Sequence, residues 1–184
     1  EIVTQRRAHS AGAQSALGRK PATLKVVRPT LRHLADRIGS RLRAKALAGR
    51  TVTVRVRFAD FTAVTRAATL PAPIAATTTL SEVAEELAMG VLGDHPDEGV
   101  ITLLAISVSQ LERQPLLQLE LSFGGGDEVR RPGTRTGAAR WSADRAIDRI
   151  RDRFGWAAIG YGAVVFEARH SVPDAFRALA EKDL

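Results

Sequence analysis

Residues 51–58 alternate between apolar and polar side chains. Val52, Val54, Val56 and Phe58 alternate with Thr51, Thr53, Arg55 and Arg57. A period of two indicates a strand that is buried on one face only. The segment 51–70 therefore predicts a hairpin that turns near Ala59 and Asp60. Helices should cover its apolar face, and its open face offers guanidinium and hydroxyl donors that suit phosphate oxygens.

Two stretches of helical spacing flank this hairpin. The first stripe consists of Leu31, Leu34, Ile38 and Leu42. It predicts a helix that starts near Pro29, a residue favoured in the first turn, and is closed by Gly49. The second stripe consists of Leu80, Val83, Ala84, Leu87, Ala88 and Val91. It follows a Pro-containing loop over residues 71–78 and ends at Gly93, and Thr79 with Glu82 forms a capping-box pattern at its start.

Two further strands complete the expected fold. Residues 6–17 are weakly patterned and predict an edge strand, and residues 100–111 predict a last strand. The order is then β-α-β-β-α-β, an α+β two-layer sandwich with two helices on one face of a four-stranded sheet. The expected buried positions of the sheet are Val52, Val54, Val56, Leu104, Ile106 and Val108. The outward positions of the last strand are Leu103, Ala105, Ser107 and Ser109.

The composition shifts after Leu111. We expect a folded domain over residues 1–112, a Gly- and Arg-rich linker over 113–140, and a C-terminal extension over 141–184. Within the extension, Ser142 can cap a short helix, residues 156–166 look like a strand, and residues 172–184 look like a final helix. The helix should bury Ile147, Ile150 and Phe154 and leave Arg145, Arg149, Arg151 and Arg153 mostly solvated.

The charge balance favours a polyanionic partner. The 184-residue chain has 27 Lys and Arg against 20 Asp and Glu, a net charge of +7. Such a balance is typical of nucleic-acid binding, although a basic, solvated surface is the alternative.

The absence of cysteine excludes disulfides and zinc-thiolate sites. The lack of cysteine also fits a cytoplasmic protein. No apolar run approaches the ~20 residues of a membrane span, so we expect no membrane partner. Because the chain opens with Glu1, we expect it to be a piece of a longer protein.

No catalytic constellation is present in the sequence. His9, His33, His95 and His170 lack metal-ligand spacing. Asp94, Asp97 and Glu98 cluster in a Pro/Gly loop, which favours a solvated turn over a metal site. Residues 124–126 are three glycines without the Gly-Lys-Ser/Thr of a phosphate loop, and no Gly-x-Ser-x-Gly elbow occurs. We expect the fragment itself to make or break no bond and to hold no cofactor.

Three segments carry a family resemblance. They are AHSAGAQSAL at residues 8–17, LRHLADRIGSRLRAKALAGRTVTVRVRFADFTAVTRAATLP at residues 31–71 and VITLLAISVSQLE at residues 100–112. Together they resemble the little-finger domain of Y-family translesion DNA polymerases, the bacterial polymerase IV type. The resemblance covers roughly residues 6–112, and VRFADFTAVTR at 56–66 is its most specific part.

The resemblance implies a grip on primer-template DNA that reads phosphates and not sequence. The DNA-binding residues carried over from it are Arg6, Arg7, Ser10, Arg55, Arg57, Thr65, Arg66 and Ser107. The outward positions of the last strand depart from the family, which often has basic residues there, so grip from that strand should be weaker. The resemblance further implies a bacterial, nucleoid-associated parent enzyme. The palm domain of that enzyme, with its Mg²⁺-binding carboxylates, would lie upstream of this chain.

A second motif, QLELSF at residues 118–123, resembles the peptide by which this family binds the bacterial sliding clamp. The resemblance assigns clamp binding to Gln118, Leu119, Leu121 and Phe123. The alternative is an extra strand or tail packed on the domain, because L-x-L-x-F also alternates correctly for a strand.

Three functions therefore remain open. The first is the DNA-gripping, clamp-tethered portion of an error-prone polymerase. The second is the clamp-binding portion of a non-catalytic, polymerase-like mutasome adaptor. The third is a stand-alone α+β RNA-binding module, which would need stacking aromatics on its open face. The C-terminal extension could add DNA contacts through its arginines, provide a docking surface, or serve as structural filler.

Overall fold

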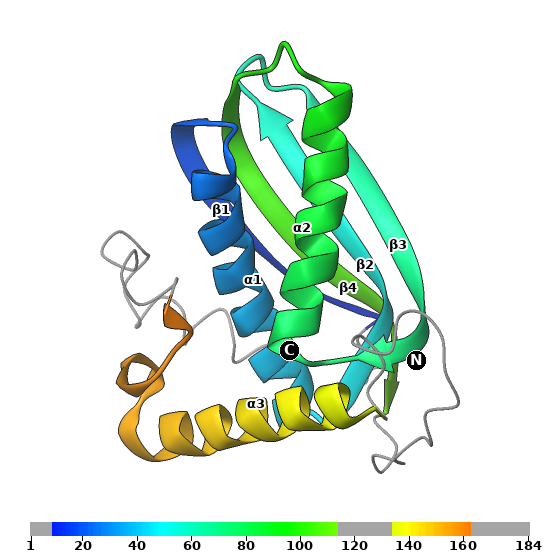
Figure 1. Cartoon of the computed structure of the whole chain (residues 1–184), viewed down its shortest axis with the longest axis vertical. Coiled ribbons are helices and arrows are strands. Elements are labelled where there is room, and N and C mark those ends of the chain that lie inside the picture. Colours follow the sequence, from blue (N-terminus) through cyan, green and yellow to red (C-terminus); the bar gives the residue numbers. More distant parts are fainter. Residues whose placement is uncertain (1–8, 114–133, 163–184) are drawn as a thin grey trace, which may run out of the picture.

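A computed structural model describes residues 9–113 and 134–162 of the chain. The expected β-α-β-β-α-β order is confirmed, followed by a further helix. The elements are β1 (Ser10–Pro21), α1 (Leu24–Ala44), β2 (Leu47–Phe58), β3 (Ala63–Ile74), α2 (Thr77–Asp94), β4 (Val100–Arg113), α3 (Arg135–Phe154) and a short 3₁₀ turn, η1 (Trp156–Ala158). The antiparallel sheet has the order β1-β4-β2-β3, and α1 and α2 lie side by side on one of its faces (Figure 1).

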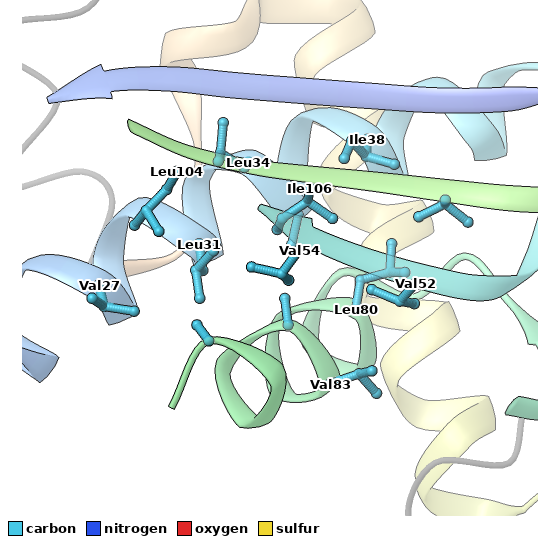
Figure 2. Close-up of a cluster of buried hydrophobic side chains, with 14 of the residues drawn as sticks. Val27, Leu31, Leu34, Ile38, Val52, Val54, Leu80, Val83, Leu104 and Ile106 are labelled. Carbon is cyan, nitrogen blue, oxygen red and sulfur yellow. The ribbon is translucent and has the colours of Figure 1, made fainter. Parts of the chain in front are cut away.

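The core lies between this helix pair and the sheet. Figure 2 shows side chains of α1 and α2 meeting those of β2 and β4. All six sheet positions expected to be buried are at most 1% exposed. Alternation along β2 and β4 therefore leaves the other face of the sheet without a covering layer of described residues.

Helix α1 begins at Leu24 and not near Pro29, which lies inside the helix. Proline removes one backbone donor there, and the Thr30 hydroxyl donates to the carbonyl of Val26 at 2.7 Å beside it. Val27, in the turn before the proline, is fully buried in the core. Burial of this turn outweighs the loss of one helical hydrogen bond.

Gly49 does not close α1, which ends at Ala44; it lies in β2. A Cβ at this position would lie 2.4 Å from Cγ1 of Val108 and 2.9 Å from the carbonyl oxygen of Ser109. The glycine is therefore needed for the close approach of β4 and not for ending the helix.

The two edge strands, β1 and β3, differ from expectation at their ends. Pro71 and Pro73 lie within β3 and not in a loop. Because β3 is an edge strand paired only with β2, prolines on its free side cost no ladder hydrogen bond. The first strand is an edge strand as expected, but it starts at Ser10 and runs on to Pro21.

Helix α3 begins at Arg135, seven residues before the expected start at Ser142. Its N-cap is Thr134, whose hydroxyl accepts from the backbone N–H of Gly137 at 3.1 Å. Figure 1 shows α3 running across one end of the α1–α2 layer. The expected contact face was wrong in part, because Phe154 is 65% exposed and Arg151 is buried, whereas Ile147 and Ile150 are half-buried.

After α3 the chain forms η1 and not the start of a strand. The remainder of that expected strand and the expected last helix lie outside the described residues. No helix among the described residues is long and apolar enough to span a membrane.

Candidate nucleic-acid interface

The open face of the sheet is defined by strand register. Residues directly opposite one another in an antiparallel ladder point to the same face. Four rows therefore cross the open face, namely Ser10–Ser109–Thr51–Thr69, Gly12–Ser107–Thr53–Ala67, Gln14–Ala105–Arg55–Thr65 and Ala16–Leu103–Arg57–Ala63. We call these positions the open face.

The open face consists mostly of small side chains, and its charged residues are all positive. Its side chains are serine, threonine, alanine, glycine, one glutamine and one leucine, together with Arg55 and Arg57. No aspartate or glutamate occupies any of these positions. Hydroxyl donors and two cations form a surface that attracts phosphate oxygens, and no carboxylate at these positions repels them.

The two arginines of the open face differ in their freedom. Arg55 is exposed and makes no hydrogen bond or ion pair within the described part of the chain. Arg57 is half-buried, its Nε donates to Oγ1 of Thr102 at 2.9 Å, and its guanidinium carbon lies 5.7 Å from the ring centre of Phe61. Arg57 is therefore held in place, whereas Arg55 is free to reach a ligand.

The hairpin tip beside Arg57 presents an exposed aromatic ring. Phe61 is 74% exposed and adopts a φ of 70°, a conformation that is rare for a bulky residue. Asp60 stabilises the turn by accepting from the backbone N–H of Thr62 at 2.8 Å and from its hydroxyl. The Thr62 hydroxyl is the main reason that the pKa of Asp60 lies below its usual value.

Arg66 does not belong to the open face. It lies opposite Val54, whose side chain is buried under the helices, and it forms an ion pair with Asp94 at the end of α2. Thr65 lies opposite Arg55 and does belong to the open face. The signal was available in the sequence, because adjacent strand residues point to opposite faces.

Ser10 and Ser107 both lie on the open face, Ser107 between Gly12 and Thr53. The outward assignment of Leu103, Ala105, Ser107 and Ser109 is confirmed. Arg6 and Arg7 lie outside the described residues, as do the four residues assigned to clamp binding, Gln118, Leu119, Leu121 and Phe123.

A buried ionic cluster between α3 and the domain was not predicted from the sequence. The guanidinium of Arg43 donates to both carboxylate oxygens of Asp148 at 2.6 and 2.9 Å, and its Nη1 lies 3.2 Å from Asp144. The same guanidinium donates to the carbonyl of Ala75 at 2.9 Å and to the Thr77 hydroxyl at 3.1 Å. Burial alone lowers the pKa of Arg43, but the Asp148 hydrogen bond and the Asp144 charge outweigh it and raise that pKa.

Two further pairs join α3 to the layer beneath it. Arg151 donates to both carboxylate oxygens of Asp36, and Arg140 does the same to Glu82. The expected capping box of α2 is wrong, because the helix begins at Thr77 with Ala76 as its N-cap. Thr79 therefore lies inside the first turn, and Thr79 and Glu82 both accept from Arg140. The N–H of Thr77, in the first turn of α2, is instead satisfied by Asp144 at 2.8 Å.

Tyr161 closes this cluster. Its hydroxyl donates to Asp144, which is 1% exposed. Burial, together with the hydrogen bond to the Asp144 carboxylate, raises the pKa of the Tyr161 phenol. A buried acid that binds a tyrosine, a helix N-terminus and an arginine at once is satisfied within the fold and is not available for catalysis.

No group of three His, Cys, Asp or Glu side chains that could hold a metal ion occurs among the described residues. Asp94, Asp97 and Glu98 do not form such a group, and Asp94 is engaged by Arg66. We therefore derive no step through a metal for this part of the chain.

Two curated relatives of this chain are DNA polymerases by name. The chain is 65% identical over all 184 residues to "DNA polymerase IV 2" of Mesorhizobium japonicum, spanning 44% of that protein. It is 31% identical over 153 residues to "DNA polymerase IV" of Streptomyces coelicolor, where the match covers 75% of this chain and 31% of the relative. The chain thus spans less than half the length of these curated relatives.

A solved structure shows the same fold. A chimeric Y-family DNA polymerase matches with a TM-score of 0.51 at 16% sequence identity, over 60% of this chain and 30% of the other. The model of the impB/mucB/samB family C-terminal domain matches residues 8–121, which take in the sheet, α1 and α2. On this match the chain belongs to the impB/mucB/samB family and contains that family's C-terminal domain.

Proposed function

We propose that this chain is the portion of an error-prone, polymerase IV-type enzyme that grips duplex primer-template DNA and tethers the enzyme to the bacterial sliding clamp. The observation that carries the DNA grip is the open face, on which Arg55 and Arg57 stand among hydroxyl side chains without any acid. Contacts from such a face go to phosphates and do not read bases, as lesion bypass requires.

The magnitude of the grip follows from the number of phosphates that it neutralises. Arg55 and Arg57 supply two cations on the open face, and Arg6 and Arg7 bring the proposed number of contacts to about four. Four contacts give a log-log salt slope of about −3.6 and an affinity of roughly 10⁻⁴ to 10⁻⁶ M near physiological salt. Thr65, Ser10 and Ser107 add hydroxyl donors but no dependence on salt.

The grip is tested by titrating a fluorescent primer-template duplex with the chain and with an Arg55→Ala/Arg57→Ala variant. We expect the variant to bind several-fold more weakly at low salt while keeping the circular dichroism and melting temperature of the parent. Equal affinity of the two proteins would show that the open face is only a solvated sheet surface.

The clamp tether rests on the QLELSF sequence at residues 118–123, next to the end of β4 at Arg113. Burial of Leu121 and Phe123 in apolar pockets contributes roughly 1.5–3 kcal/mol each, which is consistent with about micromolar affinity. Calorimetric titration against a bacterial sliding clamp should give saturable binding that is lost in a Leu121→Ala/Phe123→Ala variant. Binding that persists in the variant would place the clamp contact elsewhere in the chain.

The alternatives are less well supported. A stand-alone RNA-binding module needs aromatic side chains for base stacking, and none occupies the open face. A non-catalytic adaptor would share every feature of this chain, but the relatives matched here are named DNA polymerase IV. We therefore propose a catalytic parent whose Mg²⁺-binding carboxylates lie in an upstream palm domain, and sequencing upstream of Glu1 tests this directly.

A further inference from the structure

The charges of α3 are segregated between two faces of the helix. Its acids Asp144 and Asp148 point toward the domain and pair with Arg43. Arg145, Arg149 and Arg153 are exposed, and within the described part of the chain none of them has an ion pair. Asp152 is the one acid of α3 that is exposed. Two of the three acids of α3 therefore point inward, and the exposed side carries these three arginines with Asp152 as the one acid.

The three exposed arginines recur at every fourth residue, which places them in one stripe along the helix. With a rise of 1.5 Å per residue, neighbours in the stripe are about 6 Å apart and the whole stripe extends about 12 Å. Like charges at this spacing destabilise an isolated helix. The helix C-terminus favours a cation at Arg153, but Arg145 lies far from that end and gains nothing from it.

The stripe is held rigidly on the domain. Arg151 and Arg43 make buried, two-pronged ion pairs across the α3 interface, and Arg140 adds a third pair at the edge. Trp141 supports the first arginine of the stripe, whose guanidinium carbon lies 5.5 Å from the indole ring centre. A surface fixed in this way loses little conformational entropy when it binds a partner.

We propose that Arg145, Arg149 and Arg153 form a second phosphate-binding surface for duplex DNA, separate from the open face and outside the matched family domain. Charge complementarity identifies the partner as DNA, because a row of guanidinium groups without ion pairs complements the regularly spaced phosphates of a DNA strand. The surface deepens the proposed DNA grip by extending it to α3, and it can be tested independently of the open face.

The test is the salt dependence of binding of the full 184-residue chain to a fluorescent duplex of about 30 base pairs, three helical turns. We expect an Arg145→Gln/Arg149→Gln/Arg153→Gln variant to bind more weakly and to lose up to about 2.7 from the log-log slope. A triple lysine variant at the same positions should keep the slope, since it keeps the charges. Thermal melting checks that each variant is folded.

The matched control is Arg19→Gln/Lys20→Gln/Lys25→Gln, which removes the same charge from exposed residues at the end of β1 and the start of α1. Lys25 lies about 17 Å along α1 from Asp36, the nearest residue of that helix that pairs with α3. An equal loss of slope in this control would overturn the proposal, because net charge alone would then explain the effect. An unchanged slope in the α3 variant would also overturn it. If that variant instead lost affinity for the sliding clamp, the stripe would be a protein-binding surface.

The two DNA-binding proposals fail separately. Loss of slope in the α3 variant together with an unaffected Arg55→Ala/Arg57→Ala variant would retain the α3 surface and remove the open face. The reverse result would retain the open face alone.

Discussion

The guanidinium of Arg151 on α3 donates to both carboxylate oxygens of Asp36 on α1, at 2.9 and 2.7 Å, in a site where neither side chain is more than 7% exposed. Arg151 also donates to the carbonyl of Ile159 and lies 3.8 Å from the ring centre of Trp156. A helix outside the family domain is thus joined to that domain by charge and not by an apolar stripe.

Removal of one member of this pair should be costly. An Arg151→Met variant leaves the Asp36 carboxylate buried without a partner, and we expect a loss of about 3–5 kcal/mol in docking or folding free energy. An Arg151→Met/Asp36→Leu variant should recover much of that loss, because it leaves no unpaired charge.

Tryptophan fluorescence during urea denaturation measures this effect. The two tryptophans of the chain, Trp141 and Trp156, lie in α3 and η1 and so report on the docking of α3. A single variant as stable as the parent would mean that α3 is not locked by Arg151. A double variant no more stable than the single would contradict the predicted recovery, because removal of the unpaired carboxylate would then bring no gain in stability.

The hydrogen bond from Tyr161 to Asp144 predicts sensitivity to alkali. The raised pKa of the phenol means that the folded chain holds a proton that the unfolded chain releases near pH 10. This contribution to stability is fully present below about pH 10 and is lost as the pH rises toward the folded pKa.

A Tyr161→Phe variant is the control for this prediction, because the two proteins differ only in the phenol hydroxyl. We expect the stability of the parent to fall more steeply than that of the variant between about pH 9 and pH 11. Parallel curves would show that the phenol is not coupled to folding.

Two glycines should respond to alanine in opposite directions. At Gly49 a Cβ would meet Val108 and Leu111 at 2.4 and 2.9 Å, so we expect Gly49→Ala to cost about 1–3 kcal/mol through overpacking. At Gly93, near the end of α2, a Cβ would meet nothing within 4 Å, and Gly93→Ala should stabilise by about 0.4–1 kcal/mol. Denaturant melts of both variants measure this difference, and equal effects would contradict the strand packing around Gly49.

The sandwich was predictable because period-two alternation along 51–58 and helical stripes around Leu34 and Val83 each report burial of one face. The same alternation places Arg55 and Arg57 on the open face, and its strict use separates Thr65 from Arg66. Helix ends were less predictable. The start of α1 depends on burial of Val27, and the position of Gly49 depends on contact with β4.

The α3 interface could not be read from the sequence. Apolar periodicity pointed to Ile147, Ile150 and Phe154, but the buried contacts are made by Arg43, Asp144 and Arg151. Charged residues carry no periodic signal that distinguishes a solvated face from a buried pair, since the partner is 105 or 115 residues away. For the same reason Glu82 looked like a capping residue, although Arg140 binds it.

The central claim is that the open face grips DNA through phosphate contacts, and the salt dependence of duplex binding tests it most directly. The matched pair is Arg55→Ala/Arg57→Ala on the open face and Arg28→Ala/Arg66→Ala on the helix side, which remove the same charge from opposite faces. We predict that the first variant reduces the log-log slope by about 1.8 while the second leaves it close to that of the parent. Equal reductions in both variants, or none in the first, would contradict the account.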